Sequence, residues 1–135
     1  DLLILRGAWL GSAGHHPNTL LRNDGETFTD VTIASGLVSY HPTQTADWGD
    51  YDLDGDLDLF IGNESTSSEV HPCEMFENRG DGTFVEVSQE VGLRHIAYVT
   101  GVVWGDIDVH RDLDLHLPTM ASFNVLYENL GPAVE

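Results

Sequence analysis

The chain repeats itself, and this constrains its fold more than any other feature. The tripeptide WGD at residues 48–50 returns 56 positions later at residues 104–106. LLRNDGETFTDV at 20–31 matches MFENRGDGTFVEV at 75–87, and VLYENLG at 125–131 is a weaker third copy. A period of this length predicts one repeated supersecondary unit, and the 135 residues hold fewer than two and a half periods.

Each period is expected to contain four short strands. ADWGDY at 46–51 is the first, and LDLFIG at 57–62, apolar or alternating with Asp, is the second. Residues 73–88 form two apolar runs around a Gly-rich turn, which indicates a hairpin. Helix signals are weak, and only SQEVGL at 88–93 predicts a single helical turn.

Four antiparallel strands repeated at this spacing predict an all-β fold of β-propeller blades. We divide the chain into a partial blade at 1–37, a full blade at 38–93 and a partial blade at 94–135, with three, four and three strands. These are about two and a half blades, and a closed propeller takes at least about four. The chain, which begins with Asp rather than Met, is therefore expected to be a segment of a larger propeller or part of an assembly of copies.

The loop WGDYDLDGDLDLF, residues 48–60, carries a carboxylate at every second position. These are the five candidate metal ligands Asp50, Asp52, Asp54, Asp56 and Asp58. Calcium takes six to eight oxygens, and alternate side chains of a tight loop can supply them. We predict side-chain ligands from all of these except Asp56, which would offer its backbone carbonyl and turn its side chain to solvent. Gly55 permits a positive φ inside the loop.

Two other interpretations of this loop fit the residues less well. An EF-hand needs flanking helices and a bidentate Glu at its twelfth position, which is Ile61 here. A solvated acidic turn without metal would leave five mutually repelling carboxylates with nothing to offset their repulsion. Calcium is favoured because spacing, glycine and charge agree.

The composition narrows the possible partners. The chain has 23 acidic and 5 basic residues and a formal net charge of -18, which excludes nucleic acid and anionic membranes as expected partners. Cys73 is the only cysteine, so no intramolecular disulfide can form. No apolar run approaches membrane-spanning length and no signal peptide is seen.

The aspartate loop, followed by N-x-G-D-G-T-F at 78–84 and by V-G-L at 91–93, resembles FG-GAP/VCBS repeats. These are the calcium-binding blades of integrin-α-like β-propellers, including those of the cartilage-acidic-protein type. The resemblance covers nearly the whole chain. It implies an extracellular seven-bladed propeller, of which this chain would be a part, with calcium in the loop that joins the first two strands of a blade.

The second acidic loop departs from this pattern. It keeps four carboxylates at Asp106, Asp108, Asp112 and Asp114, but His110 and Arg111 replace the third Asp and the Gly. The loop is expected to bind calcium weakly or not at all, because a ligand is lost and a residue other than Gly occupies a position of positive φ. The Arg111 guanidinium either lies among the remaining carboxylates as a built-in cation or points to solvent.

The remaining candidates are weaker. A transition-metal site would need some of the seven histidines to converge from separate blades. Cys73 and the repeated Trp48 and Trp104 are expected to be core residues. Trp9, with His15 and His16 in a long loop, is the best candidate for a binding surface. No motif for nucleophilic catalysis is present.

The expected function is therefore non-catalytic. We expect an extracellular or secreted calcium-binding propeller module, periplasmic or cell-surface locations included, that serves adhesion or binds a protein or carbohydrate. One alternative is an accessory propeller of a secreted enzyme. The other is a self-assembling structural protein whose unfinished blades pair between copies.

Overall fold

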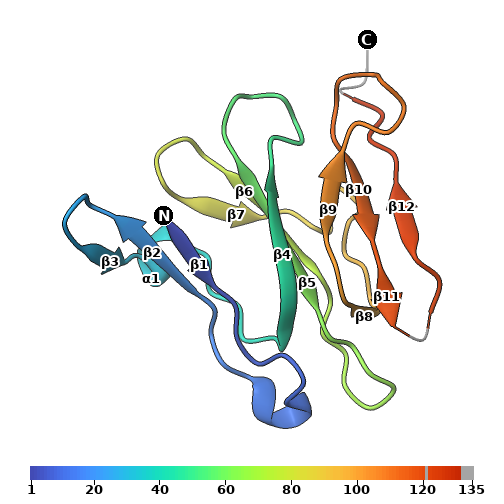
Figure 1. Cartoon of the computed structure of the whole chain (residues 1–135), viewed down its shortest axis with the longest axis horizontal. Coiled ribbons are helices and arrows are strands. Elements are labelled where there is room, and N and C mark those ends of the chain that lie inside the picture. Colours follow the sequence, from blue (N-terminus) through green and yellow to red (C-terminus); the bar gives the residue numbers. More distant parts are fainter. Residues whose placement is uncertain (121, 132–135) are drawn as a thin grey trace.

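The structure, a computed structural model, describes residues 1–120 and 122–131. Figure 1 shows small antiparallel sheets standing side by side, in chain order from one side of the molecule to the other. The first sheet has three strands, β1 (Leu2–Ile4), β2 (Thr19–Asn23) and β3 (Phe28–Asp30), paired in that order.

The central sheet has the four strands that the repeat predicts. They are β4 (Thr43–Gly49), β5 (Asp58–Asn63), β6 (Glu74–Asn78) and β7 (Phe84–Glu86), each antiparallel to the next. The predicted first strand, second strand and hairpin are thereby confirmed. Phe60 pairs with Met75 across the middle of the sheet.

The third sheet repeats this arrangement with one strand fewer. It contains β9 (Val103–Gly105), β10 (Asp114–Leu117) and β12 (Val125–Tyr127), and a short pair, β8 (Tyr98–Val99) and β11 (Thr119–Met120), adjoins it. Three, four and three strands confirm the all-β architecture of partial propeller blades. The residue boundaries of the three units at 37/38 and 93/94 stay a prediction.

The core lies between the sheets, and β5 is its centre. Every residue of β5 is buried, because successive side chains of a strand point to opposite faces and a neighbouring sheet covers each face. Leu59 and Ile61 join a cluster with Leu20 of the first sheet, whereas Phe60 joins a cluster with Leu115 of the third.

The glycine of the repeated WGD is needed where the second and third sheets meet. A Cβ on Gly49 would lie 2.8 Å from Cγ of Trp104, so any side chain here would clash with that ring. Trp104 packs edge-on against Phe60 at a centroid distance of 6.4 Å, and Trp48 packs in the same manner against Phe84 at 5.9 Å. The prediction that both repeated tryptophans belong to the core is confirmed.

The single turn predicted at residues 88–93 is present as a hydrogen-bonded turn over residues 88–92, where the N–H of Val91 donates to the carbonyl of Val87 at 3.0 Å. The short helix α1 (Thr32–Ser35) occupies the equivalent position one period earlier, and there the N–H of Ser35 donates to the carbonyl of Val31 at 2.7 Å. The anchoring contact is nonetheless the same, since the Thr32 hydroxyl accepts the N–H of Leu20 at 2.9 Å and the Ser88 hydroxyl accepts that of Met75 at 2.7 Å. No helix among the described residues is long and apolar enough to cross a membrane.

Candidate metal centres

The first acidic loop, residues 50–58, joins β4 to β5 at one end of the central sheet (Figure 1). It brings three of the five predicted carboxylates together. One oxygen from each of Asp50, Asp52 and Asp58 lies within 4.8 Å of the other two. Three carboxylates at this spacing repel one another unless a cation lies between them.

Backbone N–H groups that donate to the loop's own aspartates hold the loop in this shape. Asp52 Oδ1 accepts the N–H of Asp54 at 3.2 Å, and Asp50 Oδ2 accepts the N–H of Gly55 at 3.2 Å. Gly55 has φ of 97° and Leu53 has φ of 64°. The positive φ predicted at Gly55 is therefore confirmed, and the chain reverses in a turn that brings Asp50, Asp52 and Asp58 together.

Asp58 anchors the site. It is fully buried, and its carboxylate accepts the backbone N–H of Asn78 at 2.8 Å and of Tyr51 at 3.3 Å. Burial raises the pKa of the Asp58 carboxyl to about 6, although these two hydrogen bonds act in the opposite direction. A bound cation would remove the cost of keeping this carboxylate charged.

The other two predicted residues lie outside the triad. Asp54 is exposed, and its Oδ1 accepts the N–H of Asp56 at 2.9 Å. The Asp56 side chain was expected to face solvent but is half-buried, and its Oδ2 lies 2.7 Å from where a Cβ on Gly80 would be. The assignment of all five aspartates as ligands stays a prediction.

The donor set fits calcium. The triad offers only carboxylate oxygens, which a hard cation prefers. Among the described residues, the buried Oδ1 of Asp50 has no hydrogen-bond partner. Buried polar atoms are nearly always paired in folded proteins, so this oxygen is free to serve as a ligand.

The second acidic loop, residues 106–114, joins β9 to β10 at the same end of the neighbouring sheet (Figure 1). One oxygen from each of Asp106, Asp108 and Asp114 lies within 4.8 Å of the other two. The fourth predicted carboxylate, Asp112, is buried outside this triad. The loop therefore keeps the geometry of the first triad despite its two substitutions.

The same hydrogen bonds hold the second loop. Asp108 Oδ1 accepts the N–H of His110 at 3.1 Å, and Asp106 Oδ2 accepts that of Arg111 at 3.1 Å. Asp114 accepts the N–H of Asn129 at 2.9 Å and of Ile107 at 2.9 Å, which lowers the pKa of the Asp114 carboxyl. Arg111 has φ of 75°, so the strained position predicted from the missing glycine is present.

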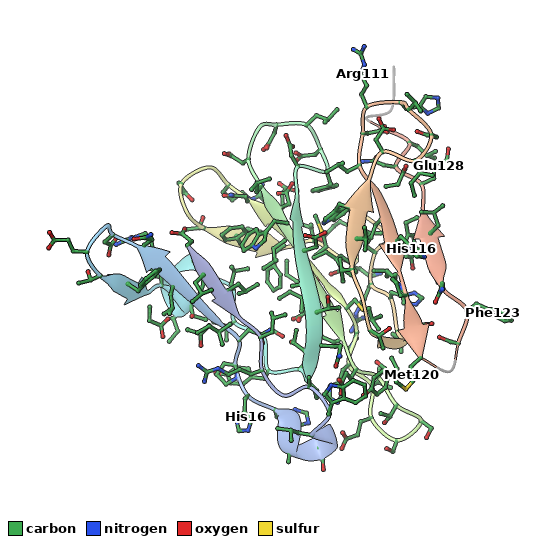
Figure 2. All side chains as sticks on the ribbon, viewed as in Figure 1. His16, Arg111, His116, Met120, Phe123 and Glu128 are labelled. Atoms are coloured by element: carbon green, nitrogen blue, oxygen red, sulfur yellow. The ribbon has the colours of Figure 1, made fainter. Side chains whose placement is uncertain are left out.

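The built-in cation hypothesis is wrong. The Arg111 side chain is exposed and points away from its loop (Figure 2), and no carboxylate of the described residues forms a salt bridge with it. The side chain that reaches a carboxylate of this loop is instead His110, whose Nδ1 lies 2.7 Å from Asp108 Oδ2.

Asp1 in the first sheet makes the hydrogen bond that Asp58 and Asp114 make in the other two sheets. Asp1 Oδ1 accepts the N–H of Asn23 at 2.8 Å, as Asp58 does from Asn78 and Asp114 from Asn129. The signal in the sequence is the opening DLLIL, which resembles the second strand of the other two periods.

The remaining candidates are scattered over the fold. Cys73 is buried, which confirms its expected core role, whereas Trp9 is 61% exposed. His16 and His71 hold equivalent repeat positions, yet His16 is exposed and His71 is buried. Glu64, a buried carboxylate that accepts the N–H of Trp9 at 3.0 Å, lies in no motif that would have singled it out from the sequence.

Comparison with known proteins identifies the repeat. A model of the FG-GAP-like repeat matches residues 1–61 and, a second time, residues 50–116. No curated protein matches the chain. The two matches span most of the sequence and both acidic loops, with the β4–β5 connection shared between them. The chain belongs to the FG-GAP-like repeat family.

Proposed function

We propose that this chain is an extracellular calcium-binding β-propeller module that binds a protein or a carbohydrate and catalyses no reaction. The observation that carries the proposal is the triad of Asp50, Asp52 and Asp58, with its buried third member, in the β4–β5 connection of an FG-GAP repeat. Calcium held by oxygen ligands in such a connection has a structural role.

The ion would join several elements at this end of the sheet. Asp58 begins β5, and its carboxylate also holds the N–H of Asn78 at the end of β6. Asn78 in turn donates from its side chain to the carbonyl of Leu57 at 3.1 Å. Neutralising Asp58 therefore stabilises the loop, the strand and the following turn together.

An extracellular location agrees with the carboxylate triad and with the burial of Cys73. Millimolar calcium outside cells fills even a metal site of modest affinity. Cys73 is buried, and burial raises the pKa of its thiol to about 11, so little reactive thiolate exists and oxidation is slow. The net charge of -18 disfavours nucleic acid and anionic membranes as partners.

Trp9 is the side chain best placed to contact a partner. Its ring is 61% exposed and packs at 5.7 Å from that of Tyr98. Both carboxylate oxygens of the buried Glu64 accept its backbone N–H, at 3.1 and 3.0 Å. An exposed aromatic ring on a backbone held in this way costs little conformational entropy when it binds.

Binding to arrays of glycans and of extracellular proteins, in millimolar calcium and in chelator, tests the proposal. Wild type should bind a ligand in calcium, and Trp9→Ala should lose at least about tenfold in affinity, as expected for an aromatic contact. Phe123→Ala is the matched control, because Phe123 is 93% exposed and points outward elsewhere on the surface (Figure 2).

Two outcomes would contradict the proposal. If ligand binding changed neither in chelator nor in Trp9→Ala, then neither calcium nor the loop that carries Trp9 would contribute to the function. Chemical conversion of an array ligand by the purified chain would show catalysis.

Self-association is a second candidate function. Among the described strands, β1 pairs only with β2, and β12 pairs only with β10, so each presents an unpaired edge. Such edges can pair with another copy by strand addition. Light scattering at micromolar concentrations would show a mass well above the 14.8 kDa of one chain if copies assemble, and the mass of one chain if they do not.

A further inference from the structure

Three side chains from two connections meet at the end of the molecule opposite the acidic loops. His15 follows the short helix η1 (Gly11–Gly14) in the β1–β2 connection, and Glu69 and His71 lie in the β5–β6 connection. Figure 1 shows both connections below the sheets and the acidic loops above them. One ligand atom of each residue lies within 4.8 Å of the other two.

His71 is the fixed member of this cluster. It is only 5% exposed, and among the described residues its buried Nε2 has no hydrogen-bond partner. The Oε2 of Glu69 lies 3.6 Å away, which is beyond hydrogen-bond distance. A buried nitrogen left without a partner destabilises the folded state, so this atom requires an explanation.

The other nitrogen of His71 is already engaged. Its Nδ1 lies 3.0 Å from Nδ1 of His41, so one of the two carries the shared proton. When His71 carries it, the lone pair of His71 is on Nε2, on the side of Glu69. Histidines that bind metals commonly donate their second N–H in this way, which fixes the ring and its tautomer. His41 would thus position His71 without binding the ion.

The spacing suits a shared ion better than direct contact. Ligands about 2.0–2.1 Å from a tetrahedral zinc ion are about 3.3 Å apart, and the His71 Nε2 and Glu69 Oε2 atoms are 3.6 Å apart. The rings of His15 and His71 have centroids 5.0 Å apart. His15 is exposed, so rotation of its side chain can close the remaining distance.

We infer that His15, Glu69 and His71 form a second kind of metal site, for a borderline divalent cation of the zinc, nickel or copper class. Two imidazoles and one carboxylate match the ligand preferences of these ions, whereas calcium prefers oxygen alone. Three protein ligands leave a fourth position, on the exposed side of His15, for water. The ion would join the β1–β2 connection to the β5–β6 connection, and with them the first sheet to the central sheet.

Zinc titration of tag-free full-length chain tests the site. Calorimetry is run in millimolar calcium, so that the first acidic loop is occupied and does not compete for zinc, and cobalt absorption in the visible reports the ligand geometry. Wild type should bind one zinc per chain and give the intense absorption of four-coordinate cobalt.

His15→Ala and Glu69→Gln carry the test, because both side chains are accessible and neither belongs to the core. Each should weaken zinc binding at least about tenfold. His16→Ala is the matched control, since His16 is the exposed neighbour of His15 and lies outside the cluster (Figure 2). It should bind zinc as wild type does.

His71→Ala removes a buried side chain and can prevent folding, so the test does not depend on it. Three results would overturn the site: no zinc binding by wild type, equal binding by His15→Ala and His16→Ala, or only the weak absorption of six-coordinate cobalt. None of these would affect the calcium proposal, which concerns other residues at the opposite end of the sheets.

Discussion

Residues 50–58 and residues 106–114 form two loops of equal length that join equivalent strands, β4 to β5 and β9 to β10. Both loops place three carboxylates within 4.8 Å of one another, and both reverse the chain through positive φ at equivalent positions. They differ at two consecutive positions, where Asp54 and Gly55 of the first loop are replaced by His110 and Arg111 in the second.

The comparison separates loop shape from loop chemistry. The shape survives without glycine, because carboxylates at both ends of each loop accept backbone N–H groups and hold the turn. The chemistry changes, because a carboxylate is lost and His110 lies 2.7 Å from Asp108. We therefore expect the first loop to bind calcium more tightly than the second, and the following changes test that difference.

The largest effect is expected from Asp58→Ala. This change removes a buried acceptor of two backbone hydrogen bonds and a ligand of the tighter site. The free energy of unfolding in millimolar calcium should fall by about 3–4 kcal/mol. Asp114→Ala in the second loop should cost about 2 kcal/mol, because it loses similar hydrogen bonds but little bound calcium. Urea unfolding measures both, and equal losses would mean that the loops bind calcium equally.

The next largest effect is expected when the first loop receives the residues of the second. Asp54→His with Gly55→Arg should weaken calcium binding at least tenfold, which is about 1.4 kcal/mol. The arginine would also adopt a φ near the 97° of Gly55, at a cost of about 1 kcal/mol. Calorimetry of calcium binding checks the first effect, and undiminished affinity would show that residues outside the triad are irrelevant.

The reciprocal exchange should create a calcium site. His110→Asp with Arg111→Gly restores the pattern of the first loop on a backbone that already has its shape. The ion count should rise from one to two per chain, with about 1.4 kcal/mol of added stability in about 1 mM calcium if the new site has a Kd near 0.1 mM. If the double variant binds no additional ion, the idea that these two substitutions disable the loop is wrong.

The smallest effect concerns the backbone alone. Arg111→Gly should stabilise the metal-free protein by about 1 kcal/mol, because glycine adopts the φ of 75° without strain. Gly55→Ala should destabilise it by a similar amount, since φ there is 97° and no other atom lies near its absent Cβ. Urea unfolding in chelator compares the two, and changes of the same sign would show that positive φ is not what distinguishes them.

The repeat made most of this fold predictable. The strands follow from apolar alternation and from turn residues, which are local properties of short segments. The positive φ of Gly55 followed in the same way from its place in the aspartate pattern. The single turn expected at 88–93 is present as a hydrogen-bonded turn, and the equivalent segment one period earlier, Thr32–Ser35, is a short helix with the same backbone hydrogen bond.

The directions of individual side chains and the contacts between distant segments could not be predicted from the sequence. The orientation of Arg111 depends on how the loop projects from the sheet, which no local pattern encodes. The positions of Asp54 and Asp56 relative to the triad depend on hydrogen bonds within the loop and on the neighbouring turn at Gly80. The meeting of His15 with His71 requires two sheets to pack side by side, and only the folded chain brings these residues together.

Calcium binding by the unmodified chain tests the central claim most directly. Thermal melts of metal-free protein, with and without millimolar calcium, are combined with calorimetric stoichiometry. The account predicts a clear rise in melting temperature with one tightly bound ion per chain, lost in Asp58→Ala and kept in Asp114→Ala. No shift in melting temperature, or a stoichiometry unchanged by Asp58→Ala, would contradict it.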